Sequence, residues 1–93
     1  MLIGVCRVII SIPESFSLKE KRKVKRSIVD KVRSKFNVSI AEVESQEIWN
    51  ELVLGISIVS TESKYIYEVM SEIIKLIEEQ KDTELIDYEI DIL

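Results

Sequence analysis

Basic side chains are concentrated in one short segment of the sequence. Residues 18–36 hold nine of them against only Glu20 and Asp30, a net charge of +7, whereas residues 37–93 carry −11 and the whole chain −4. A local cluster of cations can attract a polyanion even when the net charge is negative. We therefore expect this segment to contact phosphates through Lys19, Lys21, Arg22, Lys23, Lys25, Arg26 and Arg33.

The spacing of these cations predicts that most of them share one side of a helix. At about 100° per residue, Lys19, Arg22, Lys23, Arg26 and Arg33 fall on the outward arc. Lys21 and Lys25 fall on the apolar arc instead. Either their aliphatic stems lie along the edge of a sheet, or the first two turns project beyond it. The alternative for the whole set is an ordinary solvated helix face.

No group of residues has the types and spacing of a catalytic centre. The sequence lacks histidine, which excludes nucleophile–histidine pairs and histidine-based zinc sites. Cys6 falls on a buried strand face by parity and is expected to be inert. Two clusters of acidic residues lie within 42–47 and 87–91, and each is more typical of a solvated strand face than of a cation site. We therefore expect a non-enzymatic binding module with no metal, cofactor or small-molecule substrate.

Trp49 is the only tryptophan, and it lies in a predicted turn over residues 44–51. A tryptophan there can anchor a partner or provide a stacking surface. More often such a residue closes one end of the core, and that is the role we expect for Trp49.

Hydrophobic periodicity predicts four strands and two helices. The strands are expected at 2–12, 38–43, 52–60 and 84–92, the last with Ile86, Tyr88, Ile90 and Ile92 facing inward. The first helix should begin at Ser17, because Ser17 and Glu20 have the spacing of a capping box, and end near Phe36. The second should span 63–80, with Thr61 or Ser63 as its cap.

This order of elements, β-α-β-β-α-β, predicts an α+β ferredoxin-like fold. We expect a single domain over residues 1–93, with two helices on one face of a four-stranded antiparallel sheet. The other face would then be open and partly apolar, which is typical of an interface. It lacks the aromatic residues of an RNA-binding sheet, so an interface with a second copy of the chain or with another protein is expected there. The residues expected to form it are Ile3, Val5, Arg7, Ile9, Val53 and Val59.

Several segments together resemble the YlxP-like family, a family of small bacterial proteins of unknown function. They are GVCRV, SLKEKRKVKRSI, FNVSIAEVESQEIW and ELIDYEIDIL, in the same order along the whole chain. The resemblance implies a ferredoxin-like fold, a cytoplasmic location and genes near those of translation and ribosome maturation. It supplies no activity, cofactor or catalytic residue. A nucleic-acid-binding role for the basic helix maps onto Ser17 to Arg26.

The remaining expectations concern compartment and source. No apolar run reaches about 18 residues, and Arg7 interrupts the first one, which argues against a membrane span or a signal peptide. A single cysteine also favours the cytoplasm. Nine lysines and few amide side chains hint at a thermophile. The expected function is RNA or ribosome association through the basic helix, with a homodimerising module as the alternative.

Overall fold

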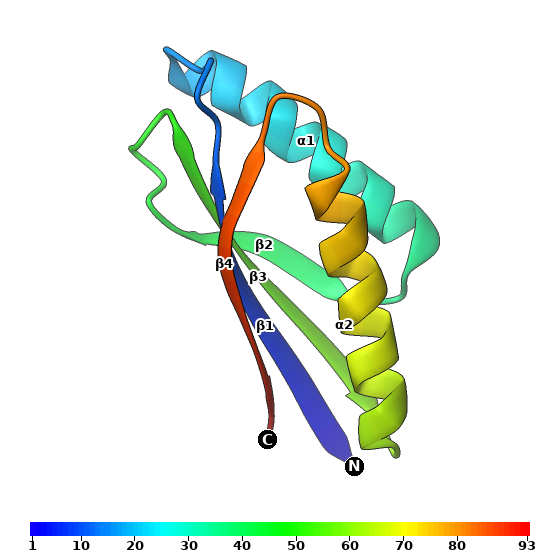
Figure 1. Ribbon diagram of the computed structural model, residues 1–93. Coiled ribbons are helices and arrows are strands. Elements are labelled where there is room, and N and C mark those ends of the chain that lie inside the picture. Colours follow the sequence, from blue (N-terminus) through cyan, green and yellow to red (C-terminus); the bar gives the residue numbers. More distant parts are fainter.

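The computed structural model describes residues 1–93 as four strands and two helices. Their order is β-α-β-β-α-β, as the periodicity predicts (Figure 1). The elements are β1 (Leu2–Ser11), α1 (Leu18–Lys35), β2 (Ser39–Glu44), β3 (Glu51–Ser60), α2 (Ser63–Glu78) and β4 (Glu84–Ile92). Neither helix is both long and apolar enough to cross a membrane.

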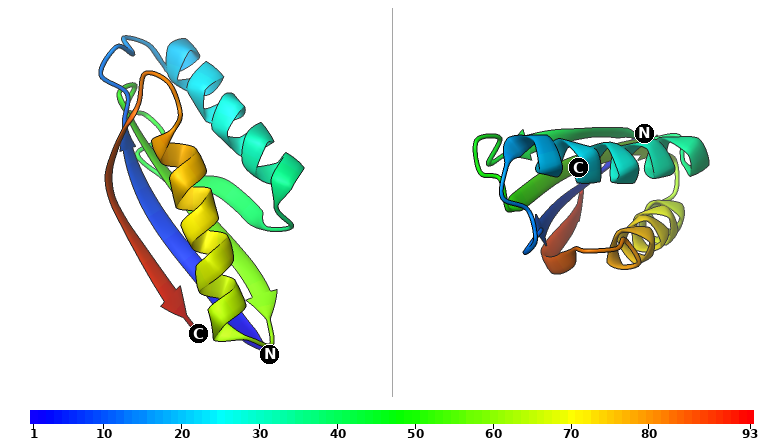
Figure 2. Two further views of the ribbon diagram at one scale, coloured as in Figure 1. Left: turned by 45° about the vertical axis from the view of Figure 1, so that its right-hand side comes forward. Right: turned by 90° about the horizontal axis from the view of Figure 1, so that it is seen from above.

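The four strands form one antiparallel sheet in the order β2-β3-β1-β4. The long central strands β1 and β3 pair over their whole length, from Leu2 opposite Ser60 to Ser11 opposite Glu51. Both helices cover the same face of this sheet (Figure 2). The ferredoxin-like fold is therefore confirmed, and the second sheet face is left without a covering layer.

The core lies between the sheet and the two helices. Burying an aliphatic side chain fully contributes about 1.5–3 kcal/mol, so the shared apolar face holds the layers together. At Gly4 of β1 the sheet and α2 approach each other closely, because a Cβ there would collide with the Ile66 side chain of α2. Within the core cluster, the side chains with the least exposure are Val8, Ile10, Ile12, Ile28, Val32, Leu52, Leu54, Ile66, Met70, Ile73 and Ile77.

The predicted cap of α1 is confirmed. Ser17 is the N-cap, and its hydroxyl accepts a hydrogen bond of 3.1 Å from the Glu20 backbone N–H. The Glu20 carboxylate reaches back and accepts from the Phe16 N–H at 2.6 Å. The start of the basic helix is thus fixed by its own first turn.

Two local predictions are wrong. Helix α2 has Glu62 as its N-cap, without a side-chain hydrogen bond, in place of Thr61 or Ser63. In β4 the register shifts opposite Ile9 and Ile10, so Leu85 packs against the core while Ile86 is exposed. Ile90 and Ile92 pack against the core as predicted, and Tyr88 pairs with the core residue Val8 but is 46% exposed. Strict alternation cannot reveal such a bulge, because one extra residue moves the side chains before it to the other face.

Candidate nucleic-acid interface

Four cations form a continuous row on the outer face of α1. Lys19, Arg22, Lys23 and Arg26 are all exposed, and none of them takes part in an ion pair or a side-chain hydrogen bond. They extend over about two helical turns, roughly 10 Å along the axis. Four unpaired charges at this spacing are free to contact a polyanion.

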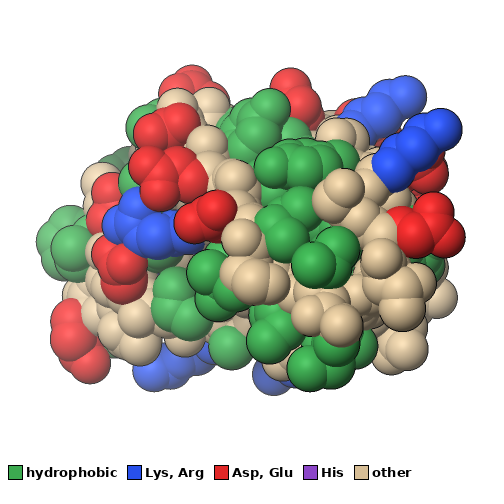
Figure 3. Space-filling model, turned by 90° about the horizontal axis from the view of Figure 1, so that it is seen from below, with side chains coloured by type: hydrophobic (Ala, Val, Ile, Leu, Met, Phe, Trp, Pro, Cys, Tyr) green, Lys and Arg blue, Asp and Glu red, His purple; other side chains and the backbone are tan.

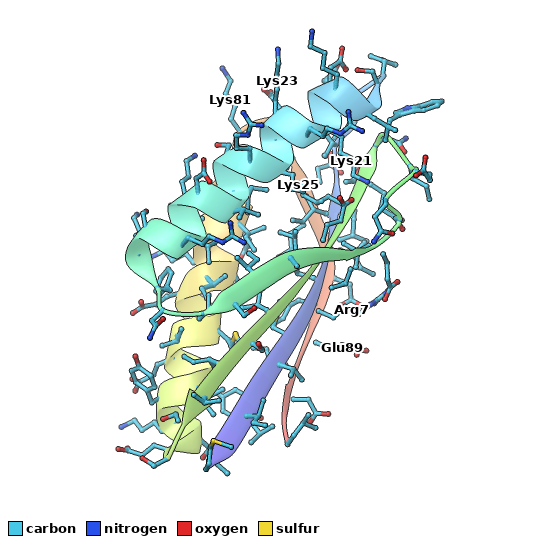
Figure 4. The ribbon with its side chains drawn as sticks, turned by 180° about the vertical axis from the view of Figure 1, so that it is seen from behind. Arg7, Lys21, Lys23, Lys25, Lys81 and Glu89 are labelled. Atoms are coloured by element: carbon cyan, nitrogen blue, oxygen red, sulfur yellow. The ribbon has the colours of Figure 1, made fainter.

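Lys21 does not belong to this row, and its predicted contact with phosphate is wrong. Its side chain is only 3% exposed and runs toward the β2–β3 turn (Figure 4). Its ammonium donates to the backbone oxygens of Ser45 and Ile48, each at 2.7 Å. A third oxygen, Oε2 of Glu42, lies 2.7 Å away. Lys21 therefore fastens α1 to the turn, and no position is left for an external anion.

Glu42 of β2 also holds Lys25. Its Oε1 lies 3.4 Å from the Lys25 ammonium, which is only partly exposed. The Oε2 atom of Glu42 is buried, and its contact with the Lys21 ammonium does not have hydrogen-bond geometry. The contact between Glu42 and Lys21 is therefore an ion pair that is largely shielded from water. One carboxylate thus offsets two lysines that the helical wheel places on the apolar arc. Lys25 contributes less to an outer interface than we expect from the sequence.

Arg33 lies at the other end of α1. It is exposed, but its guanidinium also donates to the backbone oxygen of Ile40 at 3.2 Å. Together with Lys25 and Arg26 it lines a shallow groove of about 380 Å³ between α1 and the edge strand β2. Asp30 and Glu42 line the same groove, so its charge is mixed. The strongest cationic surface is therefore the first half of α1.

The loops beside this end of α1 carry exposed aromatic and aliphatic side chains. Trp49 is 50% exposed, so the expectation that it closes the core is wrong. Phe16, in the β1–α1 loop, is 73% exposed, and Ile48 is exposed as well. Neither Phe16 nor Ile48 belongs to a periodic pattern in the sequence. Their only signal in the sequence is large apolar residues in predicted loops.

The open sheet face is less apolar than the sequence predicts. Arg7 of β1 and Glu44 of β2 form a two-pronged ion pair across it, with two hydrogen bonds of 2.6 Å. Gly55 of β3 is paired directly with Arg7, and a Cβ there would come within 2.8 Å of the Val43 side chain. Hydrogen bonding to Glu44 raises the pKa of Arg7, and the same contact lowers the pKa of Glu44.

The predicted interface residues on that face differ in how accessible they are. Ile3, Val5 and Ile9 are partly exposed, and Val59 is 62% exposed. Val53 lies outside the main core cluster but is only 2% exposed. The prediction that Val53 is an interface residue is therefore wrong, because its side chain is not accessible to a partner. On the other side of β1, Asp87, Glu89 and Asp91 are paired with Ile9, Arg7 and Val5.

Cys6 is buried in the core, as its parity predicts. Desolvation raises the pKa of its thiol to about 11. The structure also contains no cluster of three or more potential metal-ligating His, Cys, Asp or Glu side chains.

The chain is similar to known proteins at two levels. A Bacillus subtilis (strain 168) protein described as "Uncharacterized protein YlxP" is 42% identical over 60 residues, which are 64% of this chain and 65% of that protein. The alignment thus spans just under two thirds of the relative. Two de novo designed proteins share the fold at TM-scores of 0.57 and 0.58, with 16% and 14% identity.

The first of these designs, Foldit4, is covered over 97% of its length. The second, LFR1 1, is described as having a ferredoxin fold and is covered over 84% of its length. Both comparisons include the whole of this chain. At such low identity they show the fold alone. A family model described as "Protein of unknown function (DUF503)" matches residues 3–90, nearly the entire chain. The chain therefore belongs to the DUF503 family.

Proposed function

We propose that this protein binds RNA through the outer face of α1. The observation that supports this proposal best is the row of Lys19, Arg22, Lys23 and Arg26, four exposed cations without any protein partner. Cations left unpaired by the fold can neutralise phosphates and release counterions. The family resemblance makes ribosomal RNA the favoured polymer.

The distribution of acidic residues restricts the direction of approach. The segment 37–93 carries a net charge of −11, and it forms β2, β3, α2 and β4. Those acidic surfaces repel an RNA backbone, so the polymer must approach from the side of α1. Contacts of this kind position a phosphate backbone without reading bases, and we expect weak dependence on sequence.

A charge-reversal experiment tests the proposal. Binding of a fluorescein-labelled RNA is followed by anisotropy for wild type and for Arg22→Glu/Arg26→Glu. The matched control, Lys31→Glu/Lys35→Glu, makes the same charge change on a different side of the same helix. Four phosphate contacts predict that wild-type affinity falls about 50-fold between 50 and 200 mM salt. The first variant should bind far more weakly and lose much of that dependence, whereas the control should resemble wild type.

The same variants can be sedimented with purified ribosomal subunits. Co-sedimentation that is lost in Arg22→Glu/Arg26→Glu and kept in the control would support ribosome association. Equal losses in both variants, or no dependence of RNA binding on salt, would contradict a defined interface on α1.

A second candidate function is homodimerisation through the end of the open sheet face that lies near the chain termini. Val59 and Leu93 are exposed, and both lie next to Ile3. Val59 is paired with Ile3 in the sheet, and Leu93 exchanges two backbone hydrogen bonds with Ile3. Figure 3 shows hydrophobic side chains gathered at the end of the molecule seen from below. This patch predicts a dimer that Val59→Lys dissociates in sedimentation equilibrium. A monomeric mass for wild type would reject it.

A further inference from the structure

Two aromatic rings stand exposed beside the cationic half of α1. Phe16 belongs to the β1–α1 loop and Trp49 to the β2–β3 turn, yet the structure joins these segments. The Ser15 hydroxyl, directly before Phe16, donates to the Trp49 backbone oxygen at 2.6 Å. The Ile12 N–H donates to the oxygen of Asn50, directly after Trp49, at 2.9 Å. The two aromatic residues therefore lie in one loop cluster.

The same cluster is tied to α1. Lys21, one helical turn before Lys25 and between the free cations Lys19 and Arg22, donates to the oxygen of Ile48 at 2.7 Å. Arg22 itself lines a hollow of about 200 Å³ together with Gln46 and Glu47 of the turn. The cations of α1 and the two aromatic residues thus belong to adjoining segments at this end of the molecule.

The loop cluster is held in one conformation by internal contacts. Ser15 is buried, and Lys21 bridges the oxygens of Ser45 and Ile48. The Ser45 hydroxyl also donates to the Glu51 carboxylate at 2.7 Å. Large side chains that are exposed on such a fixed backbone lose little conformational freedom on binding, which favours recognition.

We propose that Trp49 and Phe16 stack against unpaired bases of a single-stranded RNA whose phosphates contact Lys19 and Arg22. Single-strand-binding proteins combine a cationic track with aromatic rings on which bases stack, because every base presents a π-face. In a duplex the bases are already stacked and paired, so these rings would have no face to contact. This inference rests on the proposed function and adds the class of RNA that the surface prefers.

A surface that combines cations with exposed apolar side chains could also bind an anionic membrane. Insertion of Trp49 and Ile48 would bring Glu47 and Asn50 into the headgroup region with them. Stacking needs only one open face of each ring and leaves the neighbouring carboxylate in water. The polar residues within the turn therefore favour bases over lipid.

The test compares an oligouridylate strand with an RNA duplex of the same length. Because Trp49 is the only tryptophan, its fluorescence reports directly on stacking and should be quenched by the single strand. Trp49→Ala keeps the backbone oxygen that Ser15 contacts, and it should bind the single strand about 5- to 150-fold more weakly while duplex binding is unchanged. Trp49→Phe should recover most of that loss. Tyr67→Ala, which removes an exposed ring from α2, is the matched control and should bind like wild type.

The outcomes separate this inference from the proposed function. Equal binding of single strand and duplex, no quenching and no effect of Trp49→Ala would overturn the stacking role, while a loss in Arg22→Glu/Arg26→Glu would still support binding through α1. Failure of wild type to bind either RNA at low salt would overturn both. Binding to phosphatidylglycerol vesicles that shifts the Trp49 emission to shorter wavelength, with no quenching by RNA, would assign the surface to a membrane and contradict the inference.

Discussion

Lys21 of α1 and Glu42 of β2 form an ion pair that the fold almost completely encloses, with Nζ 2.7 Å from Oε2. The pair joins the basic helix to the edge strand, and Lys21 also holds the β2–β3 turn through the oxygens of Ser45 and Ile48. Lys21 thus does not contact a ligand itself, but it positions the surface that the exposed cations of α1 form.

Replacing Lys21 tests this role. Lys21→Met keeps most of the side-chain volume but leaves two backbone oxygens and part of the Glu42 charge without a partner. We expect a loss of about 3 kcal/mol in the free energy of unfolding, measured by urea denaturation. Lys23→Met, on the exposed face, should change it by less than about 0.5 kcal/mol. Equal effects of the two substitutions would contradict the positioning role.

Gly4 tests the close contact between β1 and α2. A methyl group at this position would overlap the Ile66 side chain, which is fully buried and cannot move aside. Gly4→Ala should therefore cost about 1–3 kcal/mol of stability, seen as a lower thermal midpoint. Gly55→Ala is the comparison, because its methyl group meets the exposed Val43 and should cost less. The reverse order of the two midpoints would show that this account of the packing is incorrect.

The reactivity of the Cys6 thiol tests whether the central strand β1 is buried in solution. With the pKa of its thiol raised to about 11, only about a thousandth is thiolate at pH 8, and the sulfur is shielded as well. We expect almost no modification by a thiol reagent in the native state and complete modification in denaturant. Rapid labelling of the folded protein would mean that β1 opens readily.

The ion pair on the open sheet face predicts a specific pH dependence. Hydrogen bonding to Arg7 holds the pKa of Glu44 below its ordinary value of 4.5. Because the folded-state pKa is the lower one, the contribution of this pair to stability is present at neutral pH. It is lost as the pH falls from about 4.5 through the folded-state value.

A carboxyl NMR titration can measure this effect. In Arg7→Gln the pKa of Glu44 should rise toward 4.5, whereas Arg33→Gln, on the other side of the sheet, should leave it unchanged. Solvent exposure of both partners makes the effect on stability small. A Glu44 pKa that does not respond to Arg7→Gln would show that the pair is absent in solution.

Much of the fold could be predicted because its determinants are local. The capping box of Ser17 and Glu20 and the alternation of β1 and β3 depend on residues close in sequence. The bulge in β4, which exposes Ile86 and turns Leu85 toward the core, depends on the pairing with β1 and leaves no local signature. The N-cap of α2 differs from the predicted one because Glu62, a weak capping residue that makes no side-chain cap hydrogen bond, occupies that position.

The candidate site was predictable only in part, for a related reason. The outward cations Lys19, Arg22, Lys23 and Arg26 follow from helical spacing alone. The burial of Lys21 depends on Glu42 and on backbone oxygens more than twenty residues away, which no helical wheel includes. The exposure of Trp49 likewise depends on how Ser15 and Lys21 hold the turn, and a turn's orientation cannot be derived from its composition.

The most direct test of the central claim is a titration of isotope-labelled protein with oligouridylate, followed by amide and indole NMR signals. Binding through α1 and the adjoining loops predicts shifts confined to the amides of residues 16–26 and 46–50 and to the single Trp49 indole signal. The amides of β4 and of the second half of α2 should not move. Shifts centred on Ile3, Val5 and Val59, or no shifts at low salt, would contradict the proposed RNA interface.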